Sequence, residues 1–518
     1  MSMATTPDTP WQRLAVLVNG RALPKSAVPE LSITDFQQAI LGGVARQCRV
    51  AALFGMPDRT SPDALWLYVV LADDDSSRLR LGRTRIGDNS FPSLTPACWQ
   101  VHLFEREIAE QFGRVPVGHP WLKPVRFHRS YQPGRDAWNR PAEAEIAAGV
   151  MDFYQVKGDQ IHEVAVGPVH AGIIEPGHFR FQCDGENVLH LEIALGYQHR
   201  GGERALAAGP GPRSIHYAET LAGDSTIGHA TAYCQAVEAL GGIQKSARAQ
   251  SLRATALELE RLANHVGDLG ALSGDVGFTS TQAFCGRLRG EFLNMTAVLC
   301  GSRFGRGLLC PGGVRFAPDV SAIDALRRSL VRAEAETRQA VELLWNSSSV
   351  MARFVDTGVV PRQLAIDLGM VGPAARACGL NRDARQNHPS GLFRFTHIPV
   401  ATWESGDVFA RAYVRFLEVQ RSCEFVCQQL DSLPSGAVRS PLAPLAADSL
   451  AVALVEAWRG EVCHVVLTDE QGCFERYKVV DPSFHNWAAV AMALRGGQIS
   501  DFPLCNKSFN LSYCGHDL

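Results

Sequence analysis

The sequence predicts an α+β fold: a small α/β domain in residues 1–128, then a mainly α-helical domain with a small antiparallel sheet in residues 151–518. Three observations support this division. Strand-like and helix-like runs alternate in the first region, long helical stripes fill much of the second, and a hairpin-like block lies at 167–203. Residues 129–150 are rich in Arg, Pro and small residues without a clear period, so we place a linker there.

The first region is predicted to hold two strands and two helices. Residues 14–18 and 65–71 have strand composition, and residues 34–48 have a helical pattern. A second helix, 97–112, carries apolar residues on one face and is followed by Gly113, a common residue at a helix end. These elements are enough for a small α/β domain.

The second region contains four apolar stripes at helical spacing, in residues 230–240, 246–269, 321–344 and 407–430. The first stripe is followed by Gly241, and the third begins with a Ser-x-x-Asp sequence typical of a helix N-terminus. Such stripes form the core of a protein, so we assign no chemistry to them. Helices of this length imply a helical bundle.

The hairpin-like block reads GPVHAGIIEPGHFRFQCDGENVLHLEIALGYQHRGGE, with Asp184-Gly185 as the turn signal between two alternating runs. A structural hairpin does not need proton-carrying groups at both of its ends. We therefore interpret the block as the floor of a redox or proton-transfer site, the alternative being solvated surface charges. Its ionisable residues are His170, Glu175, His178, His190, Glu192, His199, Arg200 and Glu203.

Composition excludes several classes of protein. With 46% hydrophobic and 20% charged residues, the chain resembles an ordinary globular protein, and a net charge of -3 leaves no basic excess for nucleic acid or anionic lipid. The longest apolar run, 64–72, is about half the length that spans a bilayer, and the N-terminus lacks the pattern of a secretory signal. We expect no nucleic-acid partner, no direct membrane insertion and a cytoplasmic location.

The 14 cysteines do not predict a metal cluster, because no two of them form a CxxC pair. Cys423 and Cys427, the nearest pair, lie four residues apart on an apolar helix face. We expect the cysteines to be buried apolar residues of a reducing compartment.

The hairpin block also carries a resemblance to known proteins. GPVHAGIIEPGHFRF followed by LGYQHRGGE resembles the opening motif of the large subunits of membrane-bound, energy-converting nickel-iron hydrogenases of the formate-hydrogenlyase type. More loosely, it resembles the quinone-site (D-type) subunit of complex I, the NADH-quinone oxidoreductase. Further landmarks follow in the family's order at 261–277, 310–316, 356–379 and 456–466.

The first region is similar to the small hydrophilic (C-type) subunit of complex I, through FEREIAEQFG and VPVGHPWLKPVRF. The resemblance therefore covers residues from about 65 to 501, and the chain looks like a fusion of the two subunits. It implies that the first region is a docking domain, and that the second has the fold of a nickel-iron hydrogenase large subunit.

Nickel-iron hydrogenases hold their metals with four thiolates, and the resemblance implies where these would stand. Ala222 and Ser225 occupy the first two positions, and Ser483 and Asn486, in VVDPSFHNW, occupy the other two. None of these side chains can replace a bridging thiolate. We therefore expect no nickel-iron centre, and an iron-sulfur cluster only in a partner subunit.

The resemblance implies three catalytic residues. Glu175 matches a glutamate that passes protons in the hydrogenases, and Asp275 matches the acidic residue that pairs with a quinone-side histidine in complex I. Gly223 stands where complex I has its quinone-binding tyrosine, so Tyr217 is the nearest group of the right type. A tyrosine near a quinone oxygen would supply a proton as negative charge develops during reduction. The alternative for Tyr217 is a core tyrosine with a satisfied hydroxyl.

The remaining candidates would bind or orient cofactors. Ile174 stands where complex I has its second loop histidine, which leaves His178 nearby and His170 at the first position. His199 and Arg200 lie in the HRGGE motif, which in the family faces the iron-sulfur subunit. A cation beside a cluster raises its potential, and Arg459 in EAWRGE is assigned to the same architecture. The alternative for both arginines is a surface salt-bridge pair.

These features predict a catalytic-type large subunit that passes electrons from an iron-sulfur (B-type) partner to a quinone-like acceptor. It would lie peripherally on the cytoplasmic side of the inner membrane and reach antiporter-like membrane subunits through the complex. One alternative is a non-catalytic subunit that couples partner movement to those membrane subunits. Another is a nickel-iron hydrogenase with unusual ligands.

The resemblance also bears on the C-terminal segment. Hydrogenase large subunits are trimmed after nickel insertion, so without nickel we expect residues 488–518 to remain. Their interspersed apolar residues predict a strand or loop packed on the body.

Overall fold

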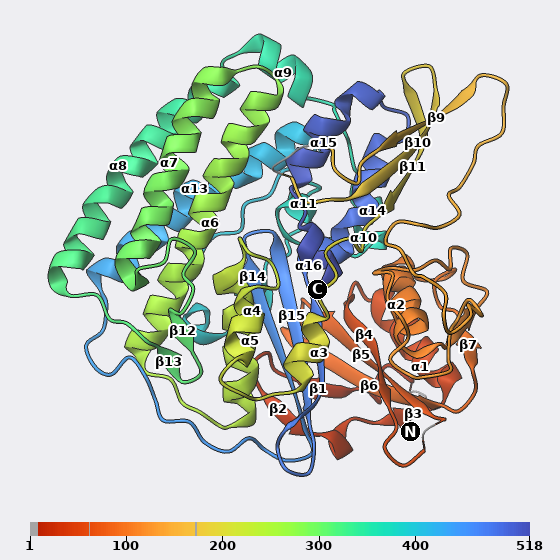
Figure 1. Ribbon diagram of the computed structural model, residues 1–518. Coiled ribbons are helices and arrows are strands. Elements are labelled where there is room, and N and C mark those ends of the chain that lie inside the picture. Colours follow the sequence, from red (N-terminus) through yellow and green to blue (C-terminus); the bar gives the residue numbers. More distant parts are fainter. Residues whose placement is uncertain (1–8, 62, 171–173) are drawn as a thin grey trace, which may run out of the picture.

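The computed structural model describes residues 9–61, 63–170 and 174–518 (Figure 1). The first region forms a sheet in the order β1-β6-β5-β4, with short β3 (Glu30–Leu31) parallel to β6. Ser32 caps the first helix by accepting the Asp35 N–H, and Gly113 ends the second at a positive φ of 64°. The elements are β1 (Ala15–Leu17), α1 (Ile33–Val44), β4 (Arg49–Pro57), β5 (Leu65–Asp73), β6 (Arg78–Ile86) and α2 (His102–Phe112). All four predicted elements of this region are confirmed.

A second sheet joins the two ends of the chain. Its order is β16-β15-β14-β2, so that β2 (Ala22–Pro24), from the first region, pairs with β14 (Ser449–Ala457). Side chains of β14 and β15 (Gly460–Thr468) also enter the apolar core of the first region. The two predicted domains therefore share a sheet and a core, and their boundaries at 128 and 150 stay a prediction.

Long helices form a bundle on one side of this sheet (Figure 1). They are α5 (Thr226–Leu240), α6 (Ala247–Asp275), α7 (Thr279–Cys300), α8 (Val320–Trp345) and α13 (Val408–Asp431). The four predicted helices are confirmed, but α7 was not foreseen because its sequence is rich in Thr, Gly and Arg. The N-cap of α8 is Asp319, which accepts the Ala322 N–H, rather than the predicted Ser321. No helix in the described ranges is long and apolar enough to cross a membrane.

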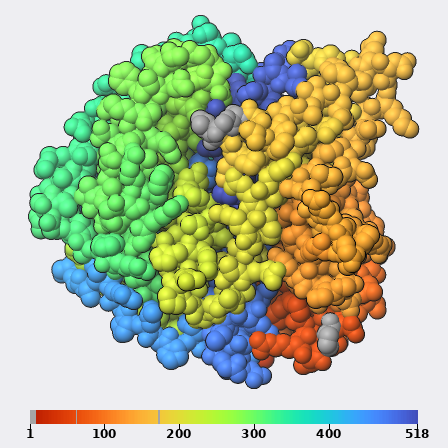
Figure 2. All heavy atoms as spheres, in the orientation of Figure 1, coloured from red at the N-terminus to blue at the C-terminus, as the bar shows by residue number. Residues whose placement is uncertain are grey.

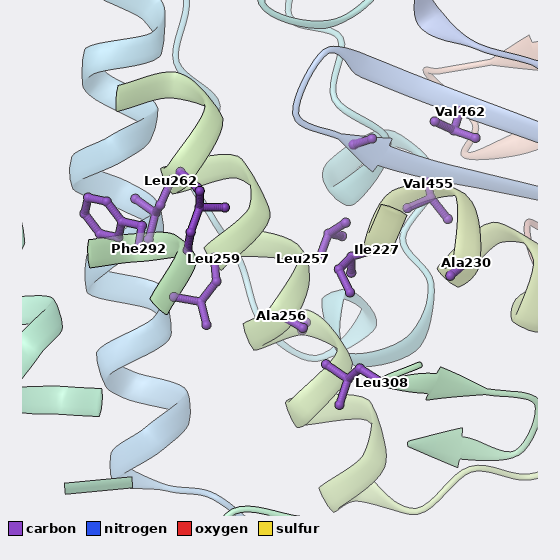
Figure 3. Packing of buried hydrophobic residues seen from close by; sticks show 14 of the residues in the cluster. Ile227, Ala230, Ala256, Leu257, Leu259, Leu262, Phe292, Leu308, Val455 and Val462 are labelled. Atoms are coloured by element: carbon purple, nitrogen blue, oxygen red, sulfur yellow. The ribbon is translucent and has the colours of Figure 1, made fainter. Parts of the chain in front are cut away.

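Helix α6 is buried on two sides, as Figure 3 shows. Leu259 and Leu262 lie on the side of Phe292 of α7, whereas Leu257 lies on the side of Ile227 and Val455. The helix thus packs against both the bundle and the central sheet.

The predicted hairpin is confirmed as β10 (His178–Asp184) and β11 (Asn187–Ala194), with β9 (Ile161–Val166) added at the edge. Asp184 pairs with Asn187, so the turn consists of Gly185 and Glu186, one residue later than predicted. Gly185 has a positive φ of 56°, which glycine adopts without strain.

The C-terminal segment is helical, and the prediction of a strand or loop was wrong. It holds the end of α14 (Pro482–Leu494), then α15 (Phe502–Phe509) and α16 (Tyr513–Asp517). Most of its apolar residues pack on the core of the hairpin sheet, which includes Phe179. The segment covers this sheet with the apolar residues of α14 and α15, and it does not add a strand to the sheet edge.

Shorter elements complete the fold. They are β7 (Ser90–Pro92), β8 (Val115–Val117), α3 (Gly202–Ala207), α4 (Ser214–Glu219), β12 (Leu309–Cys310), β13 (Gly313–Val314), α9 (Ser348–Phe354), α10 (Arg362–Asp367), α11 (Gly372–Arg376), α12 (Ala384–Asn387) and β16 (Phe474–Val480).

Candidate functional site

The candidate site is built around the loop between α4 and α5, which holds Gly223, Asp224 and Ser225. Helix α6 presents a polar stripe to this site, at the helical spacing i, i+4 and i+8. Glu260 accepts the N–H groups of Ile227 and Gly228 at 2.6 and 3.1 Å, and so caps the start of α5. The other members of the stripe are Asn264, which donates to the Asp224 carbonyl at 3.0 Å, and Asp268, which accepts from Asn510.

Arg459 crosses the site from the turn between β14 and β15. Its guanidinium donates to both carboxylate oxygens of Asp224, and its Nε donates to the Asn510 carbonyl at 2.6 Å. The side chain is buried, and the charge of Asp224 raises the pKa of Arg459 above its ordinary value. Arg459 therefore connects the loop to the C-terminal segment.

The start of α16 lies against the same loop. Glu175 caps this helix by accepting the N–H groups of Tyr513 and Cys514 at 3.0 and 3.4 Å. The Cys514 thiol lies against the backbone N–H of Gly223, and burial raises the pKa of this thiol to about 12. His170 approaches the Tyr513 hydroxyl at 3.3 Å. Figure 2 shows dark blue atoms of the C-terminal segment at the bottom of a hollow on this face.

The last residues of the sequence contact the HRGGE segment. The carboxylate of Asp517 accepts the N–H groups of Gly196 and Gln198, and the Asp517 carbonyl is 2.8 Å from Nδ1 of His199. The Leu518 carbonyl accepts the N–H groups of residues 200 and 202. His199 also stacks on the imidazole ring of His128, and Arg200 donates to the Leu221 carbonyl.

The structure thus brings together Glu175, His170 and Arg459 around residues 510–514, and His199 and Arg200 around residues 517–518.

Three sequence-predicted residues lie elsewhere. Tyr217 is on α4, with 37% of its surface exposed and no hydrogen-bond partner for its hydroxyl in the described ranges. Asp275 ends α6 and forms an ion pair with Lys507 at 2.9 Å. His178 accepts from Arg180 at 3.1 Å, and burial lowers its pKa. No contact in the described part of the chain joins these three residues to one another.

The four positions assigned to metal ligands do not form one group. The hydroxyl of Ser225 contacts Arg459 at 3.4 Å, the hydroxyl of Ser483 accepts the Ser512 N–H at 2.8 Å, and Asn486 pairs with the backbone of Val371. It is the segment 510–515, not Ser483 or Asn486, that lies against the loop of residues 222–225. The family resemblance therefore placed the second pair of ligand positions, Ser483 and Asn486, too early in the chain.

The donor set does not fit a nickel-iron centre. Such a centre needs several thiolates, whereas within residues 9–61, 63–170 and 174–518 the one cysteine shown against this loop is Cys514, whose pKa of about 12 keeps it protonated at neutral pH. Among the residues that the structure describes, no group of three or more His, Cys, Asp or Glu side chains is placed to hold a metal ion.

A buried polar chain next to the site was missed from the sequence. Asp481 is 3.0 Å from Nε2 of His229, whose Nδ1 is 3.1 Å from His464, and His464 is 2.8 Å from the Tyr477 hydroxyl. All four side chains are almost fully buried. They come from α5, β15, β16 and the start of α14, so no local spacing signals them. The spacing of Glu260, Asn264 and Asp268 could have been recognised.

The pKa of Glu260 is unusual for a carboxyl group. Burial raises it to about 8, although both oxygens accept backbone N–H groups that favour the charged form. Glu260 can therefore exchange a proton near neutral pH, beside the loop of residues 222–225.

His265, one turn along α6, yields a prediction on pH. It is fully buried against Glu418, and burial lowers its pKa to about 4, compared with about 6.5 when unfolded. Between these values the unfolded state binds more protons, so stability falls as the pH falls, by up to about 1.4 kcal/mol per pH unit for this residue. Urea unfolding measured from pH 6.5 to 5 should show that the free energy of unfolding falls less in His265→Gln than in the parent.

The exposed residue His397 provides the matched control. In His397→Gln the free energy of unfolding should fall with pH as it does in the parent. The same fall in His265→Gln would contradict the effect of burial on the pKa of His265.

The sequence is similar to known proteins over most of its length. Residues 275–449 and 444–517 match the family model described as respiratory-chain NADH dehydrogenase, 49 kDa subunit. The chain is 30% identical to formate hydrogenlyase subunit 5 of Escherichia coli K12 over 526 residues, which cover 98% of this chain and 90% of that protein. It is 30% identical to hydrogenase-4 component G of the same organism, over 89% of this chain and 82% of that protein. It is 25% identical to the C/D subunit of the NADH-quinone oxidoreductase of Bdellovibrio bacteriovorus, over 71% of this chain and 68% of that protein.

Proposed function

Since the chain belongs to the family of the respiratory-chain NADH dehydrogenase 49 kDa subunit and related hydrogenase subunits, we propose that it is the fused large subunit of a complex-I-like membrane oxidoreductase. Its relatives are named as parts of formate hydrogenlyase, hydrogenase-4 and NADH-quinone oxidoreductase. The subunit would bind peripherally on the cytoplasmic side of the inner membrane, beside antiporter-like membrane subunits.

Electrons would arrive through the iron-sulfur cluster of a B-type partner and leave to a quinone-like acceptor. The observation that carries this proposal is the group of charged side chains beside the loop of residues 222–225. Two-electron reduction of a quinone builds negative charge and consumes protons. Arg459, paired with Asp224, holds a guanidinium group at the loop, and Glu260, with a pKa of about 8, holds an exchangeable proton. Glu175 lies at the start of α16, where Cys514 contacts Gly223 of the loop.

His199 and Arg200 would face the iron-sulfur partner, with His170 and His178 near the acceptor. These assignments come from the family motif. Asp275 would set the charge near the acceptor through its pair with Lys507. Because the donor set does not fit nickel and iron, no step passes through such a centre.

A second candidate function is a non-catalytic coupling subunit. It is favoured by the contacts of residues 510–518, which engage Glu175, Arg459 and His199 with the chain's own backbone. A quinone-reductase assay on the purified complex separates the two candidates. Quinone reduction supports the first, and its absence in an intact complex supports the second.

Tyr217→Phe tests the proposed proton donor. Tyr217 is partly exposed, and its hydroxyl has no partner among the described residues, so that it is available to a bound acceptor. Removing one such hydrogen bond to developing charge costs roughly 2–4 kcal/mol. Quinone turnover should therefore fall about 30-fold to several hundred-fold, whereas folding should not change, because Phe keeps the ring. Asp275→Asn should also lower turnover.

Tyr233→Phe is the matched control, since Tyr233 is buried on α5. It should leave turnover unchanged. Full activity in Tyr217→Phe would exclude Tyr217 as the donor without affecting the other assignments.

A further inference from the structure

A pocket of about 260 Å³ lies at the other end of α5 from the candidate site. Its walls come from the turn before β2, α5 from Thr231 to its C-terminal end, the first turns of α6, residues 384–385, β14 and residues 390–395. The described lining residues include none of residues 222–225 and neither Glu260 nor Arg459. The pocket is therefore separate from the site already described.

The acidic groups in the pocket wall already have cationic partners. Glu238 pairs with Arg253 at 2.6 Å and with Lys245 at 2.9 Å. Glu456 pairs with Arg376 at 2.7 Å, behind the wall. No acidic side chain among the described lining residues is left to attract a cation.

Two arginines of the wall have no such partner. Arg21, from the turn before β2, and Arg394, from the segment 391–394, line the pocket from opposite regions of the sequence. In the described ranges, neither has an ion pair or a side-chain hydrogen bond; Arg394 lies only near the ring of Phe395. Two guanidinium groups without acidic partners form an attractive site for a carboxylate or a phosphate.

The rest of the wall is partly apolar. Leu257, Phe393 and Val455 contribute side chains, and the ring of Phe393 is fixed by stacking on Phe425 at 5.7 Å. A dry cavity of about 150 Å³ is enough to bind benzene. A volume of about 260 Å³ therefore accommodates a flat apolar ring together with one anionic group.

From this combination we infer that the pocket is a binding site for a small organic anion, with its phosphate or carboxylate group between Arg21 and Arg394 and its apolar part against Phe393 and Leu257. The inference does not rest on the proposed function. It concerns the junction between the first region of the chain and the helical bundle, where β2 joins β14.

Phenyl phosphate is a suitable probe, because it combines a ring with a dianion. Calorimetric titration of the full chain with phenyl phosphate should give saturable binding in the millimolar range or tighter. The double variant Arg21→Gln/Arg394→Gln should bind at least about tenfold more weakly, since each charge-assisted hydrogen bond contributes more than about 1.4 kcal/mol. Both residues are exposed, so the fold should be retained, which the unfolding midpoint checks.

Arg328→Gln is the matched control, because it removes an exposed arginine of α8 that does not line the pocket. It should bind phenyl phosphate like the parent. Phenol and inorganic phosphate test the two halves of the ligand, and both should bind more weakly than phenyl phosphate.

Three results would each overturn the inference. The first is that phenyl phosphate does not bind at millimolar concentration, which would also favour occupation of this surface by another protein. The second is that the double variant binds phenyl phosphate as tightly as the parent. The third is that phenol alone, or inorganic phosphate alone, binds as tightly as phenyl phosphate.

Discussion

Replacing Lys478 with Met should lower the free energy of unfolding by about 3–5 kcal/mol, because it removes a buried cation shared by two buried carboxylates and leaves each with one arginine partner in the described ranges. Lys478, on β16, lies 2.6 Å from Glu107 of α2 and 2.9 Å from Glu203 of α3. All three side chains are almost fully buried, and the charge of Lys478 lowers the pKa of both glutamates. Met keeps most of the volume of Lys, so the loss measures the charge rather than a cavity.

Urea unfolding at neutral pH measures this loss. Arg327→Gln, which breaks an exposed ion pair with Asp431, should leave the midpoint nearly unchanged. A loss below about 1 kcal/mol for Lys478→Met would show that Arg126 and Arg476 are sufficient to neutralise the glutamates.

Gly372→Ala should destabilise the protein by about 2–5 kcal/mol, since it combines two unfavourable effects. Gly372 has a positive φ of 71°, where a side chain costs about 1–2 kcal/mol. A Cβ atom there would lie 2.1 Å from the carbonyl oxygen of Arg459 and 2.5 Å from Cα of Gly460. The backbone of Arg459 must then move, which adds an overpacking cost of about 1–3 kcal/mol and displaces the guanidinium from Asp224.

Gly286→Ala is the control, because Gly286 is in the middle of α7 with no atom within 4 Å of an added Cβ. This change should leave stability equal or raise it by up to about 1 kcal/mol. If Gly372→Ala unfolds like the parent, the close approach of Gly372 to the Arg459 turn is not required for the fold.

The long helices could be predicted from the sequence because their signal is local. The stripe in residues 246–269 repeats every three or four residues, and Ser246 caps the helix by accepting the Ala249 N–H. The hairpin was equally visible, because both strands alternate around a turn with glycine.

The central sheet could not be predicted in the same way. Strands β14 and β15 are buried on both faces, so their residues show no alternation between polar and apolar positions. The pairing of β2 with β14 joins residues more than 400 positions apart in the chain, a contact that no local pattern encodes.

The candidate site was predictable only in part. Glu175 and Arg459 were identified through the family motifs, and the structure places both against residues 510–514. The contacts of this segment with distant loops depend on tertiary packing, and for that reason the second pair of ligand positions was misplaced. Tyr217 and Asp275 were each selected by position in a motif, and their functional roles stay predictions.

The central claim is that this chain has the fold of its hydrogenase relatives but carries no nickel-iron centre. Elemental analysis of the purified complex for nickel tests it most directly. Because Ala222 and Ser225 belong to a loop that contacts residues 510–515, in which the one cysteine, Cys514, is protonated, we predict no stoichiometric nickel. One nickel per chain would contradict the claim.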